Sequence, residues 1–359
     1  MSFTLFVQSN SPGEISAWLH PVSIAFAKAC PEGKIVVFLT PCQYASGNEA
    51  HQAKTFPNVT KVYSPRDTLQ FLTSRPIKRP HRAPGAVLYL GGDPLYSRLL
   101  GLKLHLPVYG YTEKPVKRWR GFKRLFTKTQ DGDLMAAQIA QFLETPTHAV
   151  ATDILLFTGS RPQHTYHLLP FMAELAAKLK HLAPALEIKL SISPFISTAW
   201  LAQHHPYLPK DTWIQAEDSL ALIANTQLLV TIPGTSTAQA AYLHTPTLML
   251  LPLNEPKAFI FDGLVGLLAK TPVLGTALIS IVVAYLKTQK RFYALPNLAT
   301  HQKVISELIG VLDPQTVAEE ILSTHFPHPN RDQVRHIMAQ HFQPSTHTAE
   351  LIIRQILEG

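Results

Sequence analysis

The hydrophobic residues of this chain fall into short apolar runs that alternate with stretches of helical period. Short apolar runs fit strands buried on both faces, and apolar positions three or four apart fit helices. Their alternation predicts parallel sheets joined by helical crossovers. The predicted strands are Phe3–Gln8, Lys34–Thr40, Val59–Tyr63, Ala86–Leu90, Val108–Tyr111, Leu125–Thr127, Ile154–Phe157, Glu187–Ile192, Leu228–Ile232 and Thr247–Leu251.

Helical patterns connect these runs and divide the chain into two halves. The predicted helices are Ile15–Ala29, Asp133–Leu143, His167–Leu182, Ser219–Ala224, one that starts at Thr237 and a helical tail from Gln315. The polar segment Glu144–His148 is the expected connection between the halves. We therefore expect an α/β chain with an N-terminal Rossmann-like domain at 1–148 and a C-terminal one at 149–325. Helices at 326–359 could pack back on the N-terminal domain.

Composition narrows the class of protein. With 359 residues, 46% of them hydrophobic, the chain can bury two cores of ordinary domain size. Cys30 and Cys42 fit no zinc or redox spacing, which favours a reducing, cytoplasmic compartment. The opening segment Met1–Gln8 resembles a first strand and not a signal peptide. A net charge of +8 with a pI of about 9.4 favours anionic partners, either a nucleic acid or an anionic membrane surface.

Two glycine turns in the second half carry the strongest chemical signal. Gly159, Ser160 and Arg161 follow one apolar run, and Gly234, Thr235 and Ser236 follow another. Each turn leads into a helical pattern, so it offers free backbone N–H groups and a positive helix end to an anion. Such turns at the carboxyl ends of parallel strands predict a nucleotide site, although ordinary strand-to-helix turns have the same pattern.

Basic and aromatic residues interleave over Lys114–Lys128, which includes Trp119 and Phe122. One interpretation is a solvated loop with buried rings, and another is an anchor to an anionic membrane with interfacial aromatics. Nucleic acids also bind cations interleaved with aromatic rings, but no nucleic-acid module accompanies the stretch. We therefore expect no nucleic-acid partner.

A long apolar stretch lies at Ala258–Lys287 and is followed by Lys290 and Arg291. Lys270-Thr271-Pro272 divides it, and the second run is shorter than the roughly 18 to 20 residues that a membrane span needs. A buried core helix and a segment dipping into the membrane interface both fit. The flanking cations slightly favour the interfacial segment.

Five landmarks in order resemble the bacterial lipid-A-disaccharide synthase family, whose members are membrane-associated glycosyltransferases of the two-Rossmann GT-B type. They are Gly13-Glu14-Ile15-Ser16, Gly91-Gly92-Asp93, Gly159-Ser160-Arg161, Pro233-Gly234-Thr235-Ser236-Thr237, and Leu295-Pro296-Asn297-Leu298 with Glu307-Leu308. The resemblance implies two Rossmann-like domains facing across a cleft. It also implies an inverting transfer of a sugar from UDP-diacylglucosamine to a lipid-linked sugar phosphate at the inner face of the cytoplasmic membrane.

The resemblance assigns roles to the landmark residues. Asp93 is the candidate base for the acceptor hydroxyl, and Arg161 is the candidate for binding the diphosphate. Backbone amides and a cation can stabilise the departing diphosphate, so we expect neither a metal nor a cofactor. The other candidates are Gly159, Ser160, Gly234, Thr235 and Ser236 for the nucleotide, Gln239 for the ribose, Gly13 and Glu14 for the acceptor, and Asn297 for the sugar or diphosphate.

Departures from the family pattern keep alternatives open. Ala17-Trp18, His164 and Gln239 stand where the family has Gly-Asp, Glu and Glu. The alternatives are transfer of another UDP-sugar to another membrane lipid, an inactive lipid-binding relative, and a UDP-sugar epimerase. The peptidoglycan precursor transferase is disfavoured because its Gly-Gly-Thr-Gly-Gly-His opening is absent. Relatives of this fold often cross back or exchange their C-terminal helices between subunits, which leaves a homodimer open.

Overall fold

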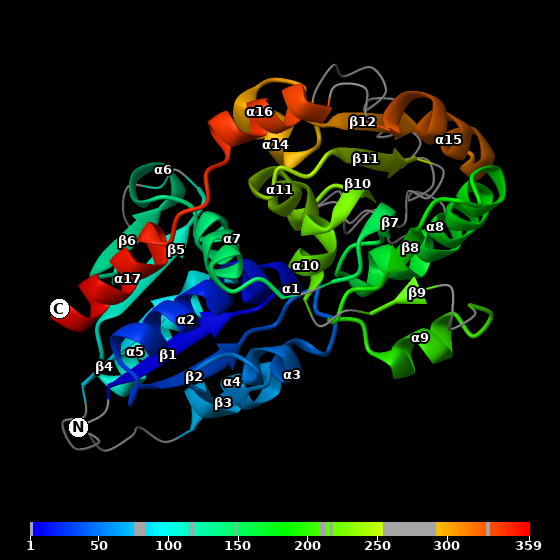
Figure 1. Ribbon diagram of the computed structural model, residues 1–359. Helices are drawn as coiled ribbons and strands as arrows, with labels where there is room; N and C mark the ends of the chain where they lie inside the picture. Colours follow the sequence, from blue (N-terminus) through cyan, green and yellow to red (C-terminus); the bar gives the residue numbers. More distant parts are fainter. Residues whose placement is uncertain are drawn as a thin grey trace. The chain divides into compact units, whose positions relative to one another are not determined.

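The computed structural model describes residues 3–74, 84–114, 116, 119–147, 149–208, 213–215, 218–253, 292–327 and 331–359. The chain forms two compact units (Figure 1). Unit 1 comprises Met1–Pro146 and Pro344–Gly359, and unit 2 comprises Thr147–Gln343. The apolar stretch 258–287 lies outside the described residues.

Unit 1 is built on a six-stranded sheet in the order β3-β2-β1-β4-β5-β6. Its strand pairs are all parallel, and the central strands are buried on both faces, which explains their continuous apolar sequences. The strands are β1 (Thr4–Ser9), β2 (Lys34–Leu39), β3 (Val59–Tyr63), β4 (Gly85–Tyr89), β5 (Val108–Thr112) and β6 (Arg124–Thr127).

The first helix of unit 1 begins shortly after β1, and a π-helical turn interrupts its α-helical hydrogen bonding. A capping box at Ser11 and Glu14 starts α1 (Pro12–Glu14), the π-helical turn η1 (Ile15–Leu19) follows, and α2 (His20–Ala29) completes the helix. The π-helical turn is a feature that is often found at functional sites. The remaining helices of the N-terminal segment are α3 (Glu49–Lys54), α4 (Pro65–Thr73), α5 (Pro94–Leu104), α6 (Lys128–Asp131) and α7 (Leu134–Glu144).

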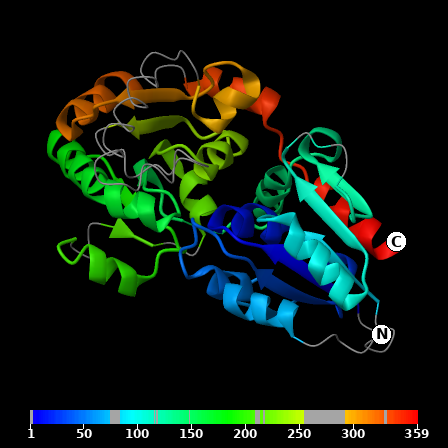
Figure 2. The same ribbon diagram turned by 180° about the vertical axis from the view of Figure 1, so that it is seen from behind.

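The last helix, α17 (His347–Glu358), belongs to unit 1 although unit 2 separates it in sequence. It packs against α2 and α7, and both ribbon views show it beside the rest of unit 1 (Figures 1 and 2). Ala349, Ile352, Ile353 and Ile356 form its buried face, at the spacing that one side of a helix requires. The Thr348 hydroxyl donates a hydrogen bond to the Asp131 carbonyl at 3.0 Å. The helix thus completes the core of unit 1.

Unit 2 repeats the architecture with a sheet in the order β12-β11-β10-β7-β8-β9, again parallel throughout the described pairs. The strands are β7 (Thr152–Phe157), β8 (Ile188–Ser191), β9 (Trp213–Ile214), β10 (Thr226–Thr231), β11 (Thr247–Pro252) and β12 (Ser306–Gly310). The helices are α8 (Pro162–Leu182), α9 (Thr198–His204), α10 (Ser219–Ala224), α11 (Thr235–Tyr242), α14 (Leu295–Thr300), α15 (Pro314–Glu320), the π-helical η3 (Ile321–His325) and α16 (Arg331–His341).

Both sheets have the strand order of a Rossmann fold, which confirms the predicted α/β class with parallel sheets. In each unit the first strand pairs with the second on one side and the fourth on the other, so the chain changes direction there. Ligands of such folds bind at the carboxyl ends of the strands at this switch point. We therefore expect ligand sites at the carboxyl ends of β1 and β4 in unit 1, and of β7 and β10 in unit 2.

The basic, aromatic stretch 114–128 is partly buried in unit 1 where the structure describes it. Phe122 is 7% exposed, and Trp119 packs edge-on against Tyr89 and Phe122. Phe122 therefore belongs to the core of unit 1, and the partly buried Trp119 packs against that core. Lys128 pairs with Asp133 at 2.7 Å, and Arg124 pairs with Asp131 at 2.9 Å. Acids of the same unit thus compensate part of the positive charge.

No helix in the described part of the chain is long and apolar enough to cross a membrane.

Candidate functional site

The first glycine turn of unit 2 lies directly at the carboxyl end of β7. Gly159 has a φ of +84°, a left-handed conformation that favours glycine, and Arg161 is the N-cap residue of α8. Pro162 occupies the first turn of the helix, where its missing N–H costs no hydrogen bond. The turn therefore places Gly159, Ser160 and Arg161 at the N-terminus of a 21-residue helix.

The second glycine turn lies at the carboxyl end of β10. Gly234 is the N-cap residue of α11 with a φ of +154°, and Thr235 and Ser236 open the helix. The Thr237 hydroxyl donates to the Gly234 carbonyl at 2.7 Å, which fixes the turn. Ser236 and Gln239 are each 8% exposed, so only a small part of each is accessible at this edge.

The two turns meet at the switch point of unit 2. A Cβ atom at Gly159 would lie 3.0 Å from Cδ1 of Ile232, the residue that follows β10. The Thr231 hydroxyl lies 2.9 Å from the Ser236 hydroxyl and 3.4 Å from the Phe157 carbonyl, and so connects the ends of β7 and β10. The structure thus brings together nucleotide candidates that are far apart in the sequence.

His164 is a buried, uncharged neighbour of the first turn. It is 6% exposed, and burial together with the nearby Arg161 guanidinium lowers the pKa of its imidazole to about 3. His164 is therefore neutral at physiological pH, and Arg161 contributes the positive charge. The position where the resembled family has an acid thus adds no negative charge that would oppose a bound anion.

In unit 1 the corresponding edge is formed by a Gly-Gly turn after β4. Gly91 and Gly92 have φ values of +141° and +83°. The buried Gln8 amide donates to the Gly91 and Asp93 carbonyls at 2.8 and 2.9 Å, and the Tyr89 hydroxyl donates to the Gly92 carbonyl at 2.7 Å. Side chains of β1 and β4 therefore hold the turn in place.

Two of the predicted site residues of the N-terminal half, Glu14 and Asp93, meet at this turn. The Glu14 carboxylate lies directly against Gly91, because a Cβ atom there would overlap Glu14 Oε2. Burial, Glu14 and Asp93 together raise the pKa of the Tyr89 hydroxyl well above its usual range. Gly13 precedes Glu14 in α1, at the same helix N-terminus.

Asn297, unlike the residues of the glycine turns, lies in the interior of unit 2 and bonds to its own segment. It is fully buried in α14, and its side-chain oxygen accepts hydrogen bonds from the Val304 and Ile305 backbone at 2.7 and 2.9 Å. Its amide nitrogen donates to the Ile305 carbonyl and to Glu307 Oε1 at 2.9 and 2.8 Å. These bonds use its polar atoms to fix the segment between α14 and β12.

We expect Asn297→Ala to lower the free energy of unfolding by about 2 to 4 kcal/mol, because it leaves buried backbone groups without partners. Urea denaturation measures the loss. Asn225→Ala is the matched control, since Asn225 is exposed and its amide donates to the Ala221 carbonyl within its own helix turn. Equal losses in the two variants would contradict the structural role of Asn297.

Several polar side chains at the strand ends were not apparent from the sequence as site candidates. Ser9 ends β1 and Asn10 follows it, Thr40 follows β2, and Thr158 follows β7. Each has a buried side-chain oxygen without a hydrogen-bond partner among the described residues. The signal that could have found them is a polar residue directly after an apolar run.

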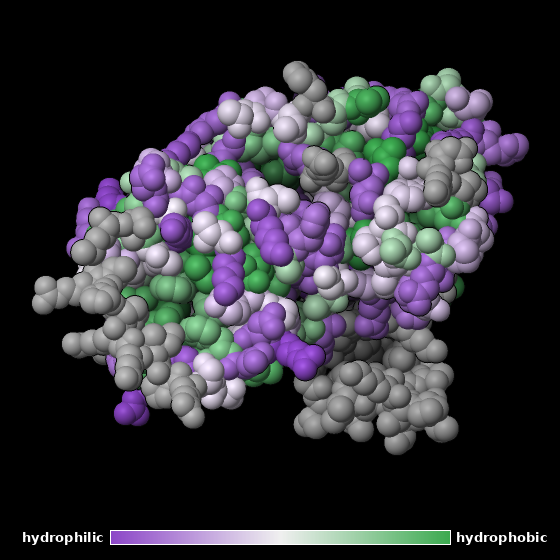
Figure 3. All heavy atoms as spheres, turned by 90° about the horizontal axis from the view of Figure 1, so that it is seen from below, coloured by the Kyte–Doolittle hydropathy of each residue, from purple (hydrophilic) through white to green (hydrophobic). Residues whose placement is uncertain are grey.

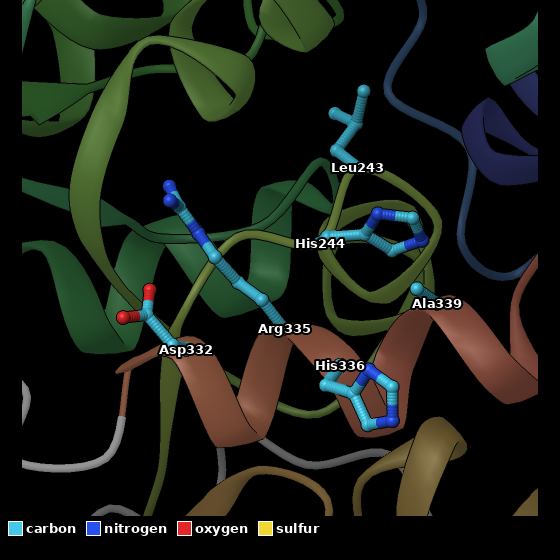
Figure 4. Close-up of a pocket in the computed structure, with 6 residues that line it drawn as sticks. All are labelled: Leu243, His244, Asp332, Arg335, His336 and Ala339. Carbon is cyan, nitrogen blue, oxygen red and sulfur yellow. The ribbon is translucent and has the colours of Figure 1, made fainter.

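A separate cavity of about 480 Å³ lies in unit 2 away from the glycine turns. Figure 4 shows Asp332, Arg335, His336 and Ala339 on α16, and Leu243 and His244 on the turn after α11. Because that turn precedes β11, the cavity is at the amino ends of the strands and includes none of the predicted site residues. Within the described ranges, no group of three or more His, Cys, Asp and Glu residues is placed to hold a metal ion.

Comparison with known proteins identifies the fold. No protein-family model matches the sequence, and no curated protein resembles it at a significant level. Solved structures do resemble it over nearly the whole chain. The UDP-GlcNAc 2-epimerase from Methanocaldococcus jannaschii has a TM-score of 0.51 and 13% identity, and the match covers 100% of both chains. The fold is of the GT-B type.

Two further structures give the same result. A Listeria monocytogenes protein assigned as a UDP-N-acetylglucosamine 2-epimerase has a TM-score of 0.55 and 12% identity, covering 98% of this chain and 95% of its own. The UDP-GlcNAc 2-epimerase from Neisseria meningitidis, bound to UDP-GlcNAc, has a TM-score of 0.50 and 12% identity, covering 99% of this chain and 100% of its own. At identities this low, the structural similarity shows a shared fold and nothing about activity.

Proposed function

We propose that the chain is an inverting glycosyltransferase that joins a UDP-linked acylated glucosamine to a lipid-linked sugar phosphate. The observation that carries the proposal is the meeting of the two glycine turns at the switch point of unit 2, where Rossmann-like folds bind nucleotides. The five landmarks that resemble those of lipid-A-disaccharide synthases support the choice of reaction. The UDP-GlcNAc bound to the Neisseria meningitidis epimerase supports the choice of donor.

In this proposal, unit 2 binds the donor. The backbone amides at Gly159, Ser160, Gly234, Thr235 and Ser236 and the guanidinium of Arg161 surround the diphosphate, while Gln239 bonds the ribose. The acceptor hydroxyl attacks the anomeric carbon, its new C–O bond forms as the bond to the diphosphate breaks, and UDP leaves. A carboxylate of unit 1 takes the hydroxyl proton, for which the sequence points to Asp93.

The test is UDP release from UDP-diacylglucosamine with diacylglucosamine 1-phosphate in detergent micelles. Disaccharide formation with one UDP released per product supports the proposal. UDP binding without turnover in the presence of this acceptor would favour another lipid acceptor or an inactive lipid-binding relative. Absence of UDP binding would contradict the nucleotide site itself.

A peripheral position at the cytoplasmic face of the membrane is part of the proposal. Leu95, Leu99 and Leu102 lie on one face of α5 and are 48%, 41% and 73% exposed. Arg98, on the same helix, packs beside Gly121 of the basic stretch. Figure 3 shows apolar and polar residues interspersed on one face of the molecule. An apolar stripe beside cations is typical of a helix that lies on an anionic bilayer.

We expect the double substitution Leu99→Glu with Leu102→Glu to reduce binding to vesicles that contain anionic lipid by at least about tenfold. Sedimentation with the vesicles measures the bound fraction. Leu143→Glu is the matched control, since Leu143 on α7 of unit 1 is 52% exposed. Unchanged binding of the double variant would contradict a contact between α5 and the membrane.

A second candidate function is the 2-epimerisation of a UDP-sugar. The specific observation in its favour is that the three solved structures compared above are described as UDP-GlcNAc 2-epimerases. An epimerase converts UDP-GlcNAc alone, whereas a transferase needs an acceptor and releases UDP. Proton NMR of UDP-GlcNAc incubated without acceptor therefore distinguishes the two functions.

A further inference from the structure

The position of Glu14 differs from that of an ordinary helix-capping acid. Its Oε2 atom accepts a hydrogen bond from the Ser11 backbone at 3.2 Å, which completes the capping box of α1. The same carboxylate lies over the Gly-Gly turn, with Oε1 2.7 Å from the place where a Cβ atom of residue 91 would be and Oε2 closer still. The absence of a side chain at Gly91 therefore makes room for a carboxylate at the switch point of unit 1.

Asp93, the other acid at this turn, has a clear structural task. Its Oδ1 atom accepts a hydrogen bond from the Leu95 backbone at 2.9 Å and caps α5. Asp93 is exposed, whereas Glu14 is half-buried. A carboxylate partly removed from water is the better placed of the two to take a proton from a bound hydroxyl.

Polar side chains from the ends of β1 and β2 lie at the same edge of the sheet, and two of them contact the Gly-Gly turn. Thr40 Oγ1 and Asn10 Nδ2 lie 2.6 and 3.0 Å from the place of a Cβ atom at Gly92. Thr40 Oγ1, Asn10 Oδ1 and Ser9 Oγ are buried and have no hydrogen-bond partner within the described ranges. Buried polar atoms are nearly always paired, so such a cluster indicates a place where a ligand supplies the partners. A ligand rich in hydroxyl groups, such as a sugar, has the matching chemistry.

We propose that Glu14 is the catalytic base that takes the proton from the acceptor hydroxyl, and that Ser9, Asn10 and Thr40 mark the subsite of the acceptor sugar. The inference rests on the proposed glycosyltransferase function. As the new glycosidic bond forms, the hydroxyl proton moves to the Glu14 carboxylate, and the electrons of the breaking bond leave with UDP. Asp93 then acts as a positioning residue that holds the start of α5.

The experiment compares Glu14→Gln with Asp93→Asn in the full chain. Asparagine caps helices as well as aspartate does, so Asp93→Asn keeps the cap. Asp67→Asn is the control, because Asp67 occupies in the capping box of α4 the position that Glu14 occupies in that of α1. The measurements are kcat, the affinity for UDP by calorimetry, the melting temperature, and kcat as a function of pH.

Glu14→Gln should lower kcat by about 10² to 10⁴, the usual contribution of a general base, and abolish the loss of kcat at acid pH. Its affinity for UDP should stay within about twofold of the original, and Asp93→Asn should lose less kcat than Glu14→Gln. The inference would be overturned if Asp93→Asn lost more kcat than Glu14→Gln, or if kcat of Glu14→Gln still fell at acid pH. Turnover by the wild-type protein would support the proposed function in either case. A wild-type protein without turnover would overturn both.

Discussion

Gly91→Ala should reduce turnover about a hundredfold, as expected for a catalytic group displaced by about 1 Å. The new Cβ atom would overlap Glu14 Oε2, so the carboxylate must move away from the turn. A flexible side chain can move at little cost, so the loss of stability comes from the backbone. A φ of +141° is unfavourable for alanine, which should cost about 1 to 3 kcal/mol. Turnover by UDP release and unfolding in urea measure the two effects separately.

Gly47→Ala provides the control for backbone strain. Gly47 is also in unit 1, has a φ of +85°, and has open space where a Cβ atom would be. It should lose a similar amount of stability without losing turnover. If both variants lose turnover equally, general destabilisation and not the position of Glu14 explains the effect.

The second large effect concerns pH. The pKa of His164 is about 3 in the folded chain and near 6.5 in the unfolded one. Between these values the unfolded state binds a proton that the folded state does not, so stability falls as the pH falls from about 6.5 towards 3. This residue alone should lower the free energy of unfolding by about 2 kcal/mol between about pH 7 and pH 4.5.

Replacement of His164 by Gln should remove that part of the pH dependence. Urea denaturation at each end of this pH range gives the difference for each protein, and subtraction cancels the contribution of the carboxylates. His181→Gln, on the exposed last turn of α8, is the control for substitution of a histidine. Equal pH dependence in the wild type and His164→Gln would show that the pKa of His164 is the same in the folded and the unfolded chain, and would contradict the lowered pKa.

The central strands of unit 1 were predictable because burial on both faces makes their sequences nearly continuously apolar. The predicted Val59–Tyr63 coincides with β3, and the other strands of this sheet differ from prediction only at their ends. In unit 2 the sequence did not reveal β9 and β12. β9 has only two residues, and β12 is half-buried with Ser306 and Glu307 among its residues, so neither presents an apolar run.

The turns of the candidate site were predictable as far as local sequence determines them. A glycine and a hydroxyl residue after an apolar run specify a strand-to-helix turn, and the structure has such turns at Gly159 and Gly234. The contact between Glu14 and Gly91 could not be predicted, because it depends on the pairing of β1 with β4, which are distant in sequence. The burial of Asn297 depends equally on β12, which the sequence did not reveal.

The return of α17 to unit 1 has a consequence for synthesis on the ribosome. The core of unit 1 includes Ile352, Ile353 and Ile356, which are translated only after the whole of unit 2. The nascent first unit therefore exposes the apolar surface of α2 and α7 that this helix later covers. Unit 2 is continuous in sequence, so it can complete its own core earlier, and chaperones have a defined interval in which to bind unit 1.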